Sequence, residues 1–212
     1  MHISDGILSP LVYISGYLVA AGIAKTTMRK IKTDKIPEVS VMTSVFFVAS
    51  LIHIPLGPTS VHLILNGLIG IVLGPCAFLA ILVGITLQAL LFQHGGITTI
   101  GINACMMGIP ALIVYQLFKL RVKFPLKNRN YKYVNGIWGA AMGGLSIFMS
   151  TIVLAVLLVT TGENFIKVAG YAVLAHIPVM IVEAVIVGFT VSFLTIVKPE
   201  VLGIKINASG NR

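Results

Sequence analysis

Charged residues are scarce in this chain, and acidic residues are the scarcest. Of its 212 residues only 10% are Asp, Glu, Lys or Arg, whereas 57% are hydrophobic. A soluble domain carries about 25% charged residues, so the composition excludes an ordinary soluble enzyme and predicts an integral membrane protein. The formal net charge is +9. Because the basic residues follow a membrane-topology pattern, described below, we expect no nucleic-acid partner.

The motifs of several enzyme classes are missing too. The sequence has no GxxxxGK(S/T) nucleotide loop, no HExxH and no GxSxG. We therefore expect that the chain is not an enzyme, and that uphill transport would need a partner or an ion gradient. Cys76 and Cys105 lie in apolar stretches without CxxC spacing and are interpreted as small buried hydrophobic residues. No basic segment precedes the first apolar run, so we expect the amino terminus to be retained.

Apolar runs divide the chain into segments, and a bilayer crossing needs about 20 residues. The approximate limits of these runs are Pro10–Ala24, Val39–Ile54, His62–Leu73, Pro75–Phe92, Thr99–Phe118, Val134–Thr160 and Val168–Val197. The third run is too short to cross as a straight helix, so it is expected to be re-entrant or to lie inside the bundle. The sequence predicts an all-α integral membrane protein, a seven-helix bundle forming one transmembrane domain over residues 1–212.

The basic residues predict the orientation of this bundle. They gather between runs one and two, between runs five and six, and after run seven. With seven crossings, all of the 15 basic residues except Lys167 fall on one side. The positive-inside rule makes that side cytoplasmic. We therefore expect a multi-pass plasma-membrane protein whose amino terminus is outside and whose carboxyl terminus is cytoplasmic.

The first two residues can form a metal chelate. The α-amine of Met1, the backbone nitrogen of His2 and the Nδ1 of His2 can all face one ion. Three nitrogens in a plane leave one in-plane position open. If another imidazole fills it, the result is a square-planar site of four nitrogens, which suits Ni(II) or Cu(II). Because chain termini are usually disordered, this interpretation depends on the rest of the sequence.

The histidines are all expected on the outer side of the bilayer. They are His2, His53, His62, His94 and His176. His62 is the preferred fourth ligand, because it follows a Gly-Pro-Thr-Ser turn that can return a side chain toward the bundle. His53 is a candidate neighbour that would orient a ligand. His94, at a Gly-Gly turn, is a weaker candidate, and Asp5 could neutralise charge near the chelate.

Polar residues inside the apolar runs leave a second interpretation open. Glu183 is the one acid within a run, and His176 lies seven residues earlier on the same helix face. An acid within the membrane is functional by default. The pair could line a proton or cation path in a self-contained, ion-coupled divalent metal carrier, or Glu183 could bond to a neighbouring helix. Asn66, Gln88 and Asn103 are expected to bond between helices.

Three segments resemble a known family: MHISDGILSP, FFVASLIHIPLGPTSVHLILNGLIGIVLGP and LQALLFQHGGITTIGIN. They resemble the CbiM/NikM family, the substrate-capture membrane subunits of energy-coupling-factor transporters for cobalt and nickel. The match extends from Met1 to about Gly108, and the second half matches mainly in hydropathy and length. The resemblance implies an amino-terminal helix added to six others, with the terminus tucked into the bundle from outside.

The resemblance also implies a site, a ligand and partners. The motif MHxxDG places two ligand residues on Met1 and His2, GPxSxH places the third on His62, and an xHxP pattern makes His53 a neighbour. High-affinity capture and import of Co²⁺ or Ni²⁺ is implied, without a resident cofactor. The implied partners are a transmembrane coupling subunit, two ATPase subunits and, in many members, a small accessory membrane subunit. The opening and FQHGGITT look more like the cobalt members, whereas planar nitrogen chemistry favours Ni(II).

Overall fold

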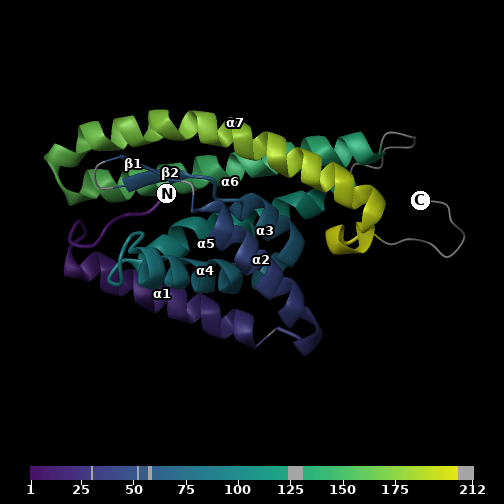
Figure 1. Ribbon diagram of the computed structural model, residues 1–212, viewed down its shortest axis with the longest axis horizontal. Helices are drawn as coiled ribbons and strands as arrows, with labels where there is room; N and C mark the ends of the chain where they lie inside the picture. Colours follow the sequence, from purple (N-terminus) through teal and green to yellow (C-terminus); the bar gives the residue numbers. More distant parts are fainter. Residues whose placement is uncertain (30, 52, 57–58, 124–130, 205–212) are drawn as a thin grey trace, which may run out of the picture.

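The computed structural model describes residues 1–29, 31–51, 53–56, 59–123 and 131–204, with side chains for all of these except 53–56, 59–61 and 122–123. Within these ranges the chain is nearly all-helical, as predicted, and has one short β-hairpin (Figure 1). The helices are α1 (Pro10–Met28), α2 (Ile36–Ala49), α3 (Asn66–Leu73), α4 (Ala77–Phe92), α5 (Ile100–Lys119), α6 (Tyr131–Thr161) and α7 (Ile166–Val197). The strands are β1 (His53–Leu56) and β2 (Thr59–His62).

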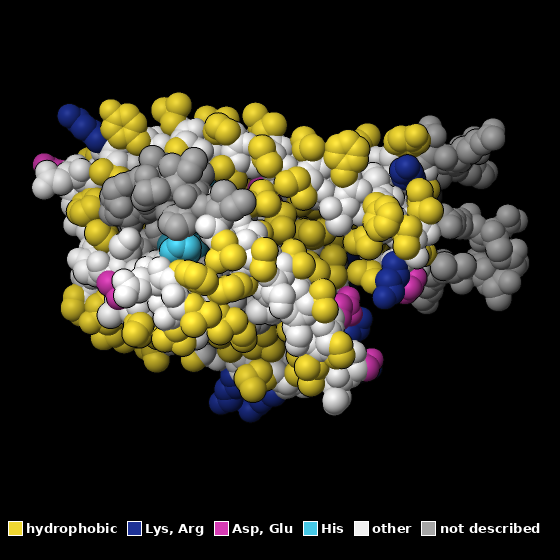
Figure 2. Space-filling model, viewed as in Figure 1, with side chains coloured by type: hydrophobic (Ala, Val, Ile, Leu, Met, Phe, Trp, Pro, Cys, Tyr) yellow, Lys and Arg dark blue, Asp and Glu magenta, His cyan; other side chains and the backbone are white. Residues whose placement is uncertain are grey.

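Five helical segments are long and apolar enough to cross a membrane: α1, Asn66–Phe92, α5, α6 and Glu163–Val197. By contrast, α2 has 14 residues and α3 has 8. At 1.5 Å per residue these helices are about 21 and 12 Å long, less than a hydrocarbon core of about 30 Å. Hydrophobic side chains are spread over much of the face in Figure 2, as expected of a surface in contact with lipid.

The segment Asn66–Phe92 turns at Gly74, whose φ of +57° favours glycine. Successive turns of this segment contact α5 in the same order along the chain. The Asn66 side chain donates a hydrogen bond to the Met107 carbonyl. A Cβ placed on Gly70 would meet Ala111, and one placed on Gly74 would meet Tyr115. Helix α3 therefore runs parallel to α5, and the chain reverses into α4 after the turn. Seven residues of α3 are buried. The third apolar run thus lies inside the bundle, which is one of the two arrangements expected for it.

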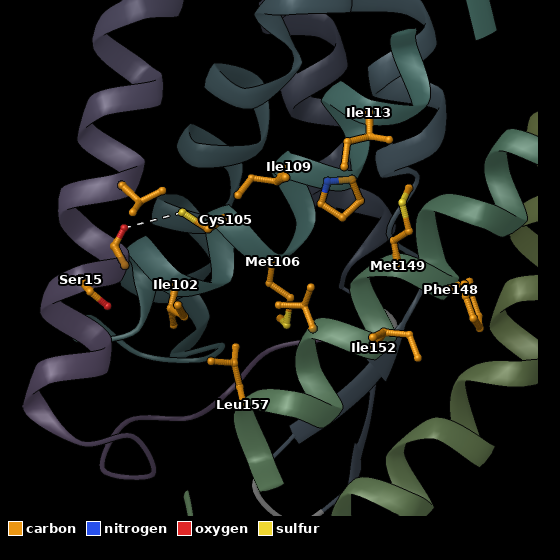
Figure 3. Close-up of a pocket in the computed structure, with 14 residues that line it drawn as sticks. Ser15, Ile102, Cys105, Met106, Ile109, Ile113, Phe148, Met149, Ile152 and Leu157 are labelled. Carbon is orange, nitrogen blue, oxygen red and sulfur yellow. Dashed lines mark hydrogen bonds between the residues drawn. The ribbon is translucent and has the colours of Figure 1, made fainter. Parts of the chain in front are cut away.

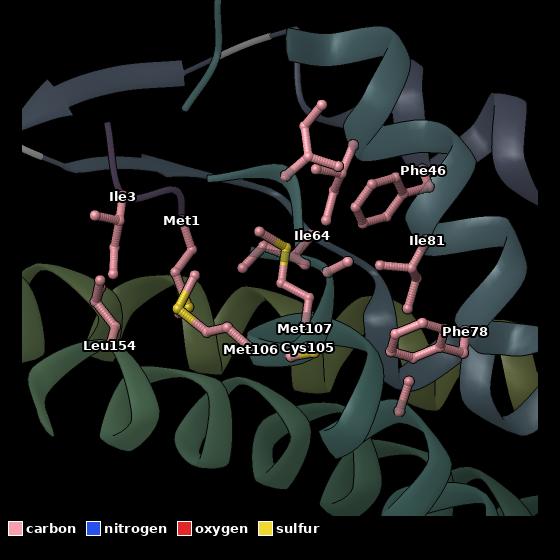
Figure 4. Close-up of a cluster of buried hydrophobic side chains, with 14 of the residues drawn as sticks. Met1, Ile3, Phe46, Ile64, Phe78, Ile81, Cys105, Met106, Met107 and Leu154 are labelled. Carbon is pink, nitrogen blue, oxygen red and sulfur yellow. The ribbon is translucent and has the colours of Figure 1, made fainter. Parts of the chain in front are cut away.

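The segment before α1 inserts into the bundle. Met1 and Ile3 are 0% exposed and His2 is 2% exposed. In Figure 4 the Met1 side chain lies beside Met106, and Ile3 points toward Leu154. Removing a large apolar side chain from water is worth about 1.5–3 kcal/mol. The apolar residues at positions 1 and 3 therefore favour insertion and carry His2 into the interior between them.

Two hydrogen-bonded clamps hold this inserted segment. The Ile3 backbone N–H donates to Oδ1 of Asn103 at 2.9 Å, and Nδ2 of Asn103 donates to the Ile3 carbonyl at 3.1 Å. The Asp5 backbone N–H donates to the Gly95 carbonyl at 2.6 Å, while its carboxylate accepts two bonds from Thr98 at 3.0 and 2.5 Å. Asn103 therefore bonds to the terminal segment rather than to another helix, and the exposed Asp5 is tied to a loop.

Replacing Asn103 by leucine is expected to loosen the inserted segment, because it removes both bonds to the Ile3 backbone. Leaving buried donors or acceptors unpaired costs about 1–3 kcal/mol, so amide hydrogen exchange at Ile3 should accelerate about tenfold or more. Gln116→Leu is a matched control, since Gln116 is an exposed amide on the same helix. Equal protection of the Ile3 amide in both variants would contradict the role of Asn103 in holding the inserted segment.

Candidate metal centre

Two histidines that lie 60 residues apart in the sequence meet in the interior. The Nδ1 of His2 lies 3.0 Å from the Nε2 of His62, and the ring centroids are 4.9 Å apart. Both rings are buried, with 2% and 3% exposed. The hairpin delivers His62 from the end of β2, where its backbone pairs with His53 of β1. The structure thus brings together the two side chains that the sequence selected as ligands.

The outer nitrogen of each ring is held by an acceptor. The Nε2 of His2 lies 2.8 Å from Oε1 of Gln88, and the Nδ1 of His62 lies 2.8 Å from the Leu63 carbonyl oxygen. Because both partners accept hydrogen bonds, the network assigns a proton to each of these ring nitrogens. In the neutral imidazoles, the remaining nitrogens are then the two that face each other.

The orientation of the Gln88 amide is itself fixed. Its Nε2 donates to the Ser50 hydroxyl at 2.7 Å, and that hydroxyl donates to the Phe47 carbonyl at 2.7 Å. The oxygen of Gln88 must therefore face His2. Gln88 joins α4 to the residue after α2, as the sequence predicts, and it also orients a candidate ligand, which the sequence did not reveal.

Two ring nitrogens that face each other at 3.0 Å with no proton assigned to either are a candidate site for a cation. Nitrogens bound at right angles, about 2.0–2.1 Å from a metal ion, lie about 2.8–3.0 Å apart. The distance from His2 to His62 therefore fits neighbouring positions of a square-planar site. Among the described residues, no three His, Cys, Asp or Glu side chains form a group that could hold a metal ion. No third described side chain of these types therefore completes a ligand group at this pair.

Burial favours the neutral forms of the bases at this position. It lowers the pKa of the Met1 α-amine well below the usual value, and the negative charge of Glu183 opposes this shift. The pKa of His62 is also lowered, first by burial and then by the charges of the Met1 amine and of His2. Neutral nitrogen is the form that binds a metal ion. The surroundings therefore reduce the competition from protons.

Two further histidines were candidates near the hairpin, and the structure describes the side chain of only one of them. The His53 side chain lies outside the described residues, so its role in orienting a ligand stays a prediction. His94 is half-buried, and its ring centroid is 6.0 Å from that of His2. Its backbone N–H donates to the Gln88 carbonyl at 3.2 Å. His94 therefore lies beside the centre, further from His2 than His62 does.

The two α7 residues considered for a cation path, His176 and Glu183, are fully buried but make separate contacts. The Nδ1 of His176 donates to the carbonyl of Ala172 on its own helix at 2.7 Å. Glu183 Oε1 accepts the backbone N–H groups of Ile64 and Leu65 at 2.5 and 2.7 Å. Glu183 thus holds the segment that follows His62. A bond from Glu183 to a neighbouring helix was one of the alternatives expected, but these donors are backbone groups, which a sequence pattern does not distinguish.

A separate pocket of about 540 Å³ lies between α1, α5 and α6. Figure 3 shows Cys105, Met106 and Ile109 among its lining residues. Its lining has no imidazole or carboxylate, and the Cys105 thiol is directed to the Gly16 carbonyl at 3.7 Å. Cys105 is buried, as predicted, whereas Cys76 is only half-buried. The chemistry of this pocket suits hydrocarbon rather than a metal ion.

Comparisons with known proteins agree with this geometry. A family model described as the cobalt uptake substrate-specific transmembrane region, CbiM, matches residues 2–201. A Haemophilus influenzae protein named as a metal transport protein is 34% identical over 209 residues, covering 95% of this chain and 97% of the relative. An Archaeoglobus fulgidus protein named as a fused nickel transport protein, NikMN, is 28% identical, covering 95% of this chain and 68% of the relative.

A solved structure gives the same result for the fold. The crystal structure of a truncated transition metal transporter is similar with a TM-score of 0.72 and 25% identity, covering 92% of this chain and 98% of that one. The family match extends over nearly the whole chain, and the apolar helices are long enough to span a bilayer. The chain therefore belongs to the CbiM family of metal transport proteins, as a multi-pass protein of the plasma membrane.

Proposed function

We propose that this chain captures Co²⁺ or Ni²⁺ with high affinity, as the substrate-binding membrane subunit of an ATP-driven energy-coupling-factor transporter. The observation that carries the proposal is the buried pair of unprotonated nitrogens on His2 and His62, 3.0 Å apart. The α-amine of Met1 and the backbone nitrogen of His2 would fill the other two positions in the plane. The metal ion is the transported ligand, and no resident cofactor is needed.

The proposed orientation places this centre on the outer side of a seven-helix bundle. Helices α1 and α7 both run from left to right in Figure 1, so their C-terminal ends, which carry Lys25 and Lys198, face the same way. The positive-inside rule assigns that side to the cytoplasm. The hairpin and α3 together would complete the return from α2, although neither α2 nor α3 is long enough to span the bilayer.

Energy for transport would come from other subunits. The chain has no nucleotide-binding motif, and a longer relative is named as a fused nickel transport protein. We propose a transmembrane coupling subunit and two ATPase subunits as partners, with a small accessory membrane subunit as a fourth partner. In this account the single domain spanning residues 1–212 binds the metal, and its partners drive the ion's release into the cell.

The alternative is a self-contained carrier that uses His176 and Glu183. The contacts of Glu183 with the backbone of Ile64 and Leu65 favour a role at the metal centre over a continuous path along α7. Equilibrium binding and liposome uptake separate the two functions. We expect one Ni²⁺ or Co²⁺ per purified chain, and no uptake into liposomes by the chain alone beyond slow leakage. Absence of binding, or rapid uptake without partners, would contradict the proposal.

Metal binding is expected to release about one proton per ion between pH 7 and 8. The lowered pKa values keep the Met1 amine and His62 neutral, so only the backbone amide of His2 must lose a proton. Affinity should therefore fall about tenfold for each unit by which pH is lowered. Calorimetry in buffers of different ionisation enthalpy measures the proton count.

A peptide of residues 1–6 is the control for this count. Its amine has an ordinary pKa of roughly 7.7–8.0, so near pH 7 the peptide should release more protons per ion than the protein does. Equal proton release from peptide and protein would show that the folded chain does not favour the neutral amine.

A further inference from the structure

We propose that Glu183 is the counter-ion of the bound cation, a role that rests on the proposed capture function. The chain has six acidic residues, and the structure describes all of them. Five are exposed or half-buried, whereas Glu183 is 0% exposed. Glu183 is therefore the Asp or Glu carboxylate that can balance the charge of a buried cation with no water between them.

Hydrogen bonds place this carboxylate next to the metal centre. Oε1 accepts from the backbone N–H groups of Ile64 and Leu65, two and three residues after His62. Since a residue advances the chain by at most about 3.6 Å, the carboxylate lies within roughly 10 Å of the His62 backbone. Two bonds to one oxygen prevent the side chain from rotating away. The anchor therefore fixes the position of the negative charge.

The second carboxylate oxygen has no partner within the described chain that would balance a charge on Glu183. Oε2 of Glu183 is buried and has no hydrogen-bond partner among the described residues. No lysine or arginine in the described part of the chain forms a salt bridge with Glu183. A buried charge without an opposite charge is costly.

The charges of the proposed centre add up to neutrality only when Glu183 is included. A divalent ion carries two positive charges, and the deprotonated amide of His2 removes one of them. The Met1 amine and the two imidazoles are neutral in the bound form. One positive charge then remains in a buried site, and an ionised Glu183 balances it. Burying a neutral assembly in a low-dielectric interior costs much less free energy than burying a charged one.

The test replaces Glu183 by glutamine, which keeps the shape and the accepting oxygen but removes the charge. A unit charge within about 10 Å at an effective dielectric constant of about 20 alters affinity by roughly tenfold or more. We therefore expect the Kd of Ni²⁺ for Glu183→Gln to rise at least about tenfold. Glu163→Gln is the matched control, because Glu163 is exposed outside α7, and its Kd should equal that of the unmodified chain.

Hydrogen exchange at Ile64 and Leu65 separates charge from anchoring. We expect both amides to stay protected in Glu183→Gln, so that weaker binding reports the lost charge. An unchanged Kd would overturn the counter-ion role. Weaker binding together with lost protection would also overturn it, since anchoring alone would then explain the effect. Failure of the unmodified chain to bind Ni²⁺ would instead reject the proposed function itself.

Discussion

Replacing His62 by alanine is expected to abolish metal binding. The Nε2 of His62 faces the Nδ1 of His2 at 3.0 Å, and no other described imidazole lies as close to His2. Loss of a residue that merely orients a metal ligand costs about 10–100-fold in affinity, so loss of the ligand itself should cost more than ~100-fold. Isothermal titration of the purified variant with Ni²⁺ and Co²⁺ measures the change.

His94→Ala is the matched control for this experiment. It removes an imidazole that lies beside the centre, with its centroid 6.0 Å from the His2 ring, and we expect a change of less than about threefold. Thermal unfolding of both variants tests whether the fold is preserved. If His94→Ala lost binding while His62→Ala retained it, the assignment of the fourth ligand would be wrong.

Extending the amino terminus by two glycines is expected to reduce affinity by more than ~100-fold as well. The extension replaces the amine of Met1 by an amide that is not a terminal donor. It also requires space where Met1 is 0% exposed, so the buried end would have to withdraw from the bundle. Titration with Ni²⁺, beside a chain carrying the same two glycines at its carboxyl end, measures the effect.

The length of the extension matters to the outcome. A single added residue would place histidine third in the chain, and a terminal amine, two amides and that imidazole can supply four nitrogens on their own. Such a chain could bind Ni²⁺ without His62. With two added residues this local chelate is lost, so unchanged affinity would show that the Met1 amine is not a ligand.

The sequence predicted the helical class and several helix limits closely. The run expected at Pro75–Phe92 corresponds to α4, which ends at the same residue, and that at Val168–Val197 corresponds to α7. The apolar runs Val39–Ile54 and His62–Leu73 predict no strand, but β1 and β2 pair where these two runs face each other. Ile54 and Val61 are β-branched residues that favour a strand. Their alternation is too short to predict a hairpin between apolar runs.

The contact between His2 and His62 was also predictable, because both are imidazoles in recognisable motifs. The surroundings of this pair were not. Gln88 orients His2 through a side-chain oxygen, and Glu183 anchors the segment after His62 through backbone amides. A sequence pattern shows which residues have polar side chains, but every residue except proline has the same backbone N–H. The partner of a buried acid therefore becomes visible only when the chain is folded.

Anomalous diffraction from crystals of the protein loaded with Ni²⁺ tests most directly whether the chain's own amino end is a ligand. The account predicts one strong peak about 2.0–2.1 Å from four nitrogens: the Met1 amine, the His2 backbone nitrogen, His2 Nδ1 and His62 Nε2. A peak bound elsewhere, or one with the Met1 amine outside bonding distance, would contradict it.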